Sequence, residues 1–206
     1  MSAPARIVAR LAFVTPEAAL AAFAGTPGLA FLDSASGHDP RAQTSYLCLQ
    51  PQAVLSLEGD PYPTLRRWMA GFAPPAPPAG WPFAFAGGAV GWIGYDLACR
   101  TAGVPSRFSP LPGLPGGWFG LYTHILGFDL ARRALVYLGP AEDLAAIAAR
   151  LQNAPAPPPL PALAWSAEMA PAGYHQRHEA LRAYIGAGDV YQANLTLRFT
   201  ARARPG

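Results

Sequence analysis

The sequence contains no lysine, because all 15 of its basic residues are arginines. A lysine nucleophile, a Schiff-base lysine and a P-loop lysine are therefore excluded within these 206 residues. Charged residues make up only 13% of the sequence, and its net charge of +3 comes from scattered arginines. Nucleic-acid binding needs a concentrated basic face, so this charge pattern predicts no nucleic-acid partner.

Cysteine is almost as scarce as lysine. Cys48 and Cys99 lie far apart among apolar residues, which fits neither a zinc site nor a disulfide framework, so we expect free thiols in a reducing compartment. No apolar run reaches the roughly 18 residues that span a bilayer. The short apolar stretch after Arg10 is interrupted by Thr15-Pro16 and does not form a signal peptide. We therefore expect a cytoplasmic protein with no membrane partner.

Hydrophobic residues are abundant, at 51%, and the prolines and glycines cluster between apolar blocks. The blocks predict an α+β fold in which a curved antiparallel sheet is flanked by helices. Residues 45–49 and 53–57 suggest a meander, and residues 119–129 and 134–138 a hairpin that turns at 130–133. We predict helices at 15–24, 63–71, 141–151 and 174–187, and further strands at 6–14, 29–33 and 190–200. Loops rich in proline or glycine are predicted at 74–80, 111–118 and 154–161.

Three segments could carry chemistry. In one of them, Leu32-Asp33-Ser34-Ala35 with the polar loop to Gln43, Asp33 and Ser34 could bind a small molecule but are by default turn residues at a strand end. Residues 83–96 are rich in glycine but have neither a GxGxxG spacing nor a following lysine, which favours a tightly packed strand over a phosphate loop. In the strand predicted at 190–200, a period of two places Gln192, Asn194 and Thr196 on one face. That face could line a polar pocket or simply face solvent, and the residues alone leave both open.

Other polar residues have simpler interpretations. His175 and His178 are spaced for zinc but lack a third ligand, so a solvated helix start is the better interpretation. His124 is predicted to be isolated, and Glu142-Asp143 to cap the helix that follows. The residues taken alone therefore indicate an α+β lobe without a catalytic set.

Three segments resemble the chorismate-utilising enzymes. Residues 85–97 (FAGGAVGWIGYDL) are similar to the F-x-G-G-x-x-G-x-x-G-Y-D-L segment of the aminodeoxychorismate synthase large-subunit branch. Residues 187–199 (AGDVYQANLTLRF) are similar to its A-G-D-x-Y-Q-x-N-L-x-x-R-F segment, and Leu32-Asp33-Ser34 lies where the family has an L-x-S element. Where this sequence has residues 191–196, the anthranilate synthase branch has F-Q-V-V-L-S. Asn194 and the ending at 94–97 therefore favour aminodeoxychorismate synthase, with anthranilate synthase as the alternative.

The resemblance implies a fold and an activity. It implies the N-terminal lobe of the anthranilate synthase/aminodeoxychorismate synthase fold, with a scaffold lobe at 1–153, a proline-rich linker at 154–165 and the start of the chorismate-binding domain at 166–206. In this family, chorismate and ammonia from a glutamine amidotransferase subunit give 4-amino-4-deoxychorismate, a precursor of p-aminobenzoate and folate. Mg²⁺ held by glutamates and a lysine nucleophile belong to a C-terminal half outside this sequence. We therefore expect an incomplete enzyme, inactive alone, with no metal ligand of its own.

The resemblance also assigns roles to individual residues. Asn194 is expected to reach the active site and position catalytic groups, and Gln192 and Thr196 to contact substrate from the same strand face. Ser34 matches the serine of a tryptophan site that some members carry. The Ser-Arg-aromatic triplet of that site is replaced by Ala42, Gln43 and Thr44, which argues against tryptophan binding. The alternative to an enzyme is a non-catalytic binding module, a lobe that binds a small ligand or the amidotransferase.

Overall fold

The computed structural model describes residues 6–34, 39, 42–72, 76–104, 113–156 and 162–202. Contacts group the chain into two units, residues 1–157 and 158–206, and each is considered by itself. The domain boundaries expected from the sequence stay a prediction. The loops predicted at 74–80, 111–118 and 154–161 each lie partly outside the described residues. Across the described ranges, no helix is both long enough and apolar enough to cross a membrane.

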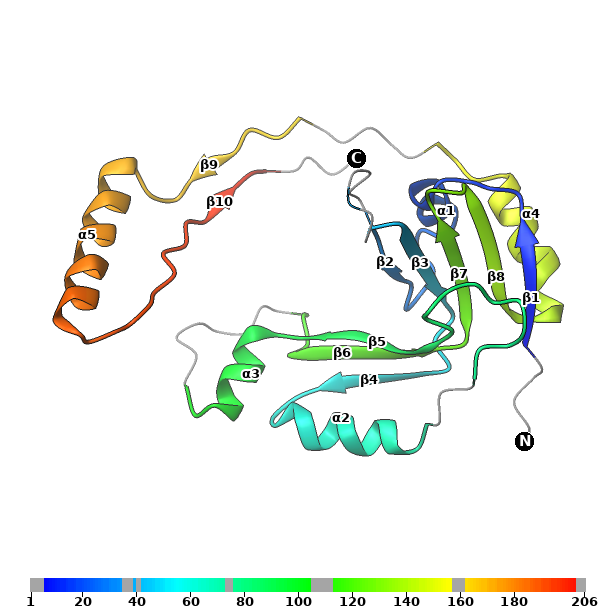
Figure 1. The fold of residues 1–206 in the computed structure, drawn as a ribbon, viewed down its shortest axis with the longest axis horizontal. Coiled ribbons are helices and arrows are strands. Elements are labelled where there is room, and N and C mark those ends of the chain that lie inside the picture. Colours follow the sequence, from blue (N-terminus) through cyan, green and yellow to red (C-terminus); the bar gives the residue numbers. More distant parts are fainter. Residues whose placement is uncertain are drawn as a thin grey trace. The chain divides into compact units, whose positions relative to one another are not determined.

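The first unit is built on two antiparallel sheets (Figure 1). A five-stranded sheet has the order β1 (Arg6–Leu11), β8 (Ala134–Pro140), β7 (His124–Asp129), β3 (Thr44–Leu49) and β2 (Ala30–Leu32). A three-stranded sheet has the order β4 (Ala53–Leu57), β6 (Gly117–Tyr122) and β5 (Gly88–Ile93). The predicted α+β class with antiparallel strands is therefore confirmed, but the strands form more than the one sheet expected.

Side-chain caps mark the starts of α1 and α2, although α2 begins two residues before the predicted residue 63. In α1 (Pro16–Ala22), the Thr15 hydroxyl accepts a hydrogen bond from the Ala18 backbone N–H at 3.2 Å, and Pro16 takes the first helical position. The Asp60 carboxylate caps α2 (Pro61–Ala70) in the same way through the Tyr62 N–H. A short turn, η1 (Ala141–Asp143), precedes α4 (Leu144–Gln152). The sequence did not predict α3 (Tyr95–Thr101).

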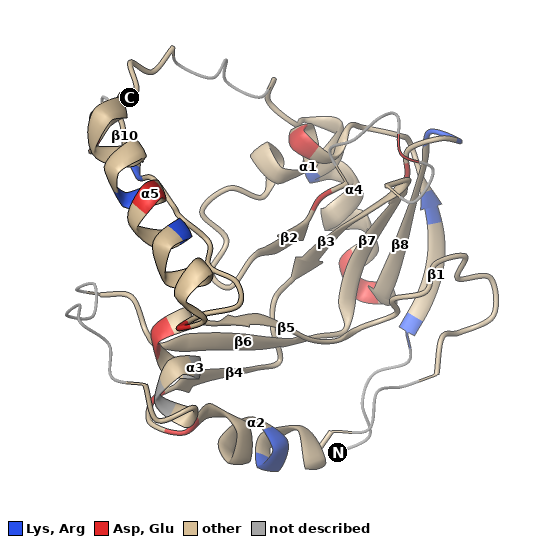
Figure 2. Cartoon of the chain, turned by 60° about the vertical axis from the view of Figure 1, so that its left-hand side comes forward, with Lys and Arg blue, Asp and Glu red and all other residues tan. Residues whose placement is uncertain are grey.

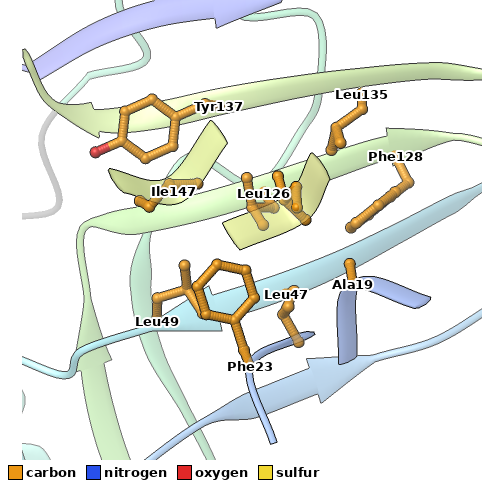
Figure 3. Close-up of a cluster of buried hydrophobic side chains, with 10 residues drawn as sticks. Ala19, Phe23, Leu47, Leu49, Leu126, Phe128, Leu135, Tyr137 and Ile147 are labelled. Atoms are coloured by element: carbon orange, nitrogen blue, oxygen red, sulfur yellow. The ribbon is translucent and has the colours of Figure 1, made fainter. Parts of the chain in front are cut away.

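Strand alternation buries both faces of the central strands β3, β7 and β8. One face packs against α1 and α4 and forms the cluster in Figure 3: Ala19, Phe23, Leu47, Leu49, Leu126, Phe128, Leu135, Tyr137, Ile147 and Leu151. Cys48, Ile125, Val136 and Leu138 point to the opposite face and pack with Trp81, Ala86 and Tyr122. The period of two thus accounts for two apolar layers on either side of one sheet.

The predicted meander is wrong, because β3 and β4 belong to different sheets. Gln50 between them adopts a φ of 48°, in the left-handed region, which turns the chain out of the first sheet. The predicted strand 119–129 is likewise two strands, β6 and β7, which separate at Thr123. The Gln52 N–H donates to the Leu121 carbonyl at 2.8 Å. The segment from β3 to β4 and the segment from β6 to β7 therefore pass from one sheet to the other at the same corner. The predicted hairpin turn at 130–133 is confirmed by the pairing of β7 with β8.

The second unit contains β9 (Ser166–Ala167), α5 (Pro171–Ala187) and β10 (Phe199–Thr200). The helix ends at Gly188, whose φ of 82° reverses the chain, as the sequence predicted. The predicted strand 190–200 is wrong over most of its length, because only residues 199–200 pair, with β9. A strand needs a partner for its backbone groups. Within the described part of this unit, the two-residue β9 is too short to pair with residues 190–198.

Candidate functional site

The most promising site lies beside α5 in the second unit. Residues 193–195 line one side of a hollow of about 280 Å³, which we call the α5 hollow. The other side is lined by five residues of the helix: Tyr174, His178, Leu181, Arg182 and Ile185. Asn194 therefore shares a concave surface with an arginine, a histidine and a tyrosine.

Helix geometry explains this arrangement. Residues spaced three or four apart fall on one face of a helix, and Tyr174, His178, Leu181, Arg182 and Ile185 follow that spacing. The turn at Gly188 lets the following segment run back along this face (Figure 1). The predicted helix is present, but no residue of α5 is buried. Of its predicted apolar face, Leu181 and Ile185 line the hollow, whereas Tyr184 is 53% exposed and lies outside the lining.

The α5 hollow has an apolar floor and a polar rim. Leu181 and Leu195 are half-buried, whereas Asn194 and Arg182 are exposed. His178 lies 3.4 Å from the carboxylate of Glu179, a neighbour that is not among the lining residues. Within the described part of the chain, no hydrogen bond or ion pair engages Arg182. Helix α5 carries two arginines, Arg177 and Arg182, and one acidic residue, Glu179 (Figure 2).

The other predicted residues of this segment do not line the hollow. Gln192 and Thr196 are exposed and lie outside it, so the structure brings only Asn194 to the α5 side. The expected strand would have aligned all three side chains, but residues 190–198 form no regular strand. Whether the three contact substrate remains a prediction.

Ser34 lies in the first unit, where its hydroxyl donates to the Thr44 carbonyl at 2.6 Å. Its backbone N–H donates to the Ser45 hydroxyl, which in turn donates to the Asp33 carboxylate at 2.8 Å. These bonds join the ends of β2 and β3, so the Ser34 hydroxyl donor is already used by the backbone. Gln43 donates to the Asp39 carbonyl at 2.9 Å, in a turn that accounts for it without a ligand.

A partly buried contact between His124 and Asp143 in the first unit corrects two predictions. His124 is not isolated, because its Nε2 lies 2.8 Å from Oδ2 of Asp143, with the histidine side chain only 10% exposed. Asp143 is the cap residue of α4, but its side chain makes no capping hydrogen bond. The pair joins the start of β7 to the start of α4, and residues 19 positions apart in sequence give no local signal of it.

The glycine-rich segment is a packed strand, as predicted. A Cβ added at Gly91 would overlap the Trp118 carbonyl oxygen and lie 2.6 Å from the Phe119 Cα. The Gly94 N–H donates to the Gly116 carbonyl at 2.7 Å. Close backbone approach to β6 therefore accounts for these glycines.

Neither Cys48 nor Tyr122 is an activated nucleophile. Both cysteines are free, as expected. Burial raises the pKa of the Cys48 thiol to about 12. Burial also raises the pKa of Tyr122 to about 12, and its hydroxyl donates to the Gly28 carbonyl at 2.6 Å. Both groups stay protonated at neutral pH and act in packing.

The donor chemistry does not fit a bound metal ion. Among the described residues, no group of three or more histidine, cysteine, aspartate or glutamate side chains is placed to hold one. His175 and His178 belong to no such group within the described ranges. The described residues offer no carboxylate set for Mg²⁺, which prefers several oxygen ligands.

Comparison with known proteins points to one family. The family model described as "chorismate binding enzyme" matches residues 30–205. Anthranilate synthase component 1 of Streptomyces coelicolor is 32% identical, over 93% of this chain and 42% of its own length. Aminodeoxychorismate synthase component 1 of Klebsiella aerogenes is 37% identical over 58% of this chain and 27% of its own length. The chain thus spans less than half the length of these relatives.

A solved structure has the same fold. The crystal structure of anthranilate synthase component I from Streptococcus pneumoniae superposes with a TM-score of 0.61 and 20% sequence identity. The similarity covers 83% of this chain and 46% of the other. It supports the predicted fold class, that of the N-terminal part of such a protein, and at this identity it concerns the fold alone.

Proposed function

The chain belongs to the chorismate-binding enzyme family, and from this premise we propose that it is part of component I of aminodeoxychorismate synthase. The reaction would replace the 4-hydroxyl group of chorismate with an amino group in the cytoplasm. The ammonia would come from a glutamine amidotransferase, a partner that the name "component 1" of the relatives suggests. Because the chain spans less than half of those relatives, we assign the activity to the enzyme as a whole.

The single observation that carries the proposal is the position of Asn194. It belongs to the segment at 187–199 that resembles the aminodeoxychorismate synthase branch, and it lines the α5 hollow. A primary amide both donates and accepts hydrogen bonds, so Asn194 can orient a substrate hydroxyl or a catalytic group. An apolar residue at this position, as in the F-Q-V-V-L-S sequence of the sister branch, could do neither.

The described residues leave part of the chemistry to other segments. They hold no lysine nucleophile and no carboxylate set for Mg²⁺. The proposal assigns Asn194 a positioning role and assigns Gln192 and Thr196 contacts with substrate.

Anthranilate synthase is the second candidate, and one observation favours it. The Streptomyces coelicolor anthranilate synthase component 1 aligns over 93% of this chain, more than the 58% that the Klebsiella aerogenes aminodeoxychorismate synthase component 1 covers. The loss of the arginine and the aromatic residue at 42–44 argues the other way, against a tryptophan-regulated enzyme.

The product distinguishes the candidates. The full-length polypeptide is incubated with chorismate, Mg²⁺ and ammonium, and the products are separated by chromatography. We expect 4-amino-4-deoxychorismate, which an added lyase converts to p-aminobenzoate. Fluorescent anthranilate formed without the lyase would replace the proposal with the second candidate. Binding of an amidotransferase without any turnover would instead favour a non-catalytic lobe.

A further inference from the structure

We propose that Arg182 binds a carboxylate group of the substrate in the α5 hollow, an inference that rests on the proposed function and extends it to a residue of the helix. Arg182 and Asn194 line the same hollow from opposite sides. The inference therefore adds a cationic group, the Arg182 guanidinium, to the Asn194 amide of the proposed function.

The charge around the hollow favours an anionic ligand. Among the described residues, its lining includes Arg182 and His178 but no aspartate or glutamate. Glu179 lies near His178, at 3.4 Å, and would offset part of the charge only there. Arg198 of the same unit is already paired with Glu168, whereas no described residue pairs with Arg182. A guanidinium group offers paired N–H donors that match a carboxylate bidentately.

The shape and surface of the hollow favour a small carbon ring. Leu181, Ile185, Ala193 and Leu195 provide apolar contacts, and Tyr174 adds a half-buried aromatic ring. Its volume of about 280 Å³ lies near the lower end of the range for small-molecule sites, roughly 300–1,000 Å³. A ring that carries carboxylates, as chorismate does, could place its carbon face on this floor and one carboxylate at Arg182.

The helix offers a matched control residue. Arg177 is also an exposed arginine of α5, but it does not line the hollow. The two positions are five residues apart, about 140° around a helix of 3.6 residues per turn. Replacing either arginine with glutamine removes the same charge from the same helix, so the comparison separates a specific contact from a general electrostatic effect.

The test measures chorismate binding to the full-length protein by isothermal titration calorimetry, together with KM and kcat where turnover occurs. We expect Arg182→Gln to raise the Kd for chorismate by about tenfold to a hundredfold, the usual cost of losing a hydrogen bond to a charged group. Arg182→Lys should recover part of the affinity, and Arg177→Gln should stay within about twofold of the wild type. KM should rise with the Kd, while kcat and the thermal midpoint change little.

The outcomes separate this inference from the proposed function. Equal Kd values for the wild type and Arg182→Gln, or equal losses in Arg182→Gln and Arg177→Gln, would overturn the carboxylate site even if the enzyme makes 4-amino-4-deoxychorismate. A wild type that binds chorismate but forms another product would overturn the proposed function, and the Kd comparison would still decide the role of Arg182. No chorismate binding by the wild type would overturn the inference outright.

Discussion

The two units of the chain differ in where their apolar side chains lie. In the first, Leu47, Leu126 and Phe128 are fully enclosed between the sheet and its helices (Figure 3). In the second, α5 buries no residue, and Tyr191 is 94% exposed. The first unit is therefore stabilised by a core, and the second by the turn at Gly188 and the short pairing of β9 with β10. The candidate site therefore lies in the second unit, whose conformation is determined less by its own packing than that of the first unit.

The largest effect should come from breaking the core of the first unit. We expect Phe128→Ala to lower the free energy of unfolding by about 3–5 kcal/mol, because it removes a buried ring and leaves a cavity. Tyr184→Ala, at a site 53% exposed on α5, should change it by less than about 0.5 kcal/mol. Urea denaturation of both variants checks this. Similar losses in the two would mean that α5 is as firmly packed as the sheet.

A smaller contrast comes from adding one methyl group to each unit. Gly91→Ala should destabilise the protein by about 1–3 kcal/mol, because the new Cβ would overlap backbone atoms of Trp118. Gly186→Ala meets nothing within 4 Å inside α5 and should stabilise the helix by about 0.5–1 kcal/mol. The signs of the two changes in unfolding free energy can be compared directly. A stabilising Gly91→Ala would contradict the close approach of β5 and β6.

Asn194 tests whether the less packed unit carries function. In the full-length protein, Asn194→Ala should lower kcat by about tenfold, the cost of one hydrogen bond of about 1.4 kcal/mol. Its thermal midpoint should stay unchanged, because the residue is exposed. Steady-state kinetics and a melting curve of the same preparation separate the two effects. Unchanged kinetics would remove Asn194 from the site.

The smallest effect concerns a surface pair of the first unit. Hydrogen bonds from Arg132, at 2.8 Å from the Asp129 carboxylate, hold the pKa of that carboxyl below its usual value of about 3.9. A lowered folded-state pKa stabilises the protein above the unfolded value, and this contribution is lost as the pH falls through the folded value.

Arg132→Gln should therefore be slightly less stable than the wild type at neutral pH, and the difference should shrink in acid. Thermal midpoints between pH 7 and pH 2 test this, with the exposed Arg66→Gln as a control. A difference that grows toward low pH would contradict the sign derived from the Asp129 pKa.

Local signals predicted the elements that local chemistry determines. Thr15-Pro16 marked the start of α1, Gly188 the end of α5, and the apolar periods most strands of the first unit. The corner at Gln50 escaped prediction because apolar residues continue on both sides of it, and periodicity does not reveal which sheet a strand joins. The strand expected at 190–200 failed for the opposite reason: its alternation is clear, but pairing depends on a partner and not on the pattern.

The site was predicted only in part, for similar reasons. Asn194 belongs to a sequence motif that pointed to it. Arg182 belongs to no such motif, and its place in the site depends on the return of the chain along α5 after Gly188. His124 and Asp143 come from different elements, and neither sequence neighbourhood signals the contact. Residues that act alone can be predicted from a sequence more readily than residues that act in pairs.

The pairing of β1 with β8 also implies a delay during synthesis between the appearance of the two strands. Arg6 lies opposite Pro140, so the first strand leaves the ribosome about 130 residues before β8, its partner among the described strands. At a translation rate of about 5–20 residues per second, this interval is on the order of ten seconds. During that time the strand's backbone groups are unsatisfied by the sheet and available to chaperones or to other nascent chains. The order in which the strands are synthesised, rather than their final packing, therefore determines when β1 can join the sheet.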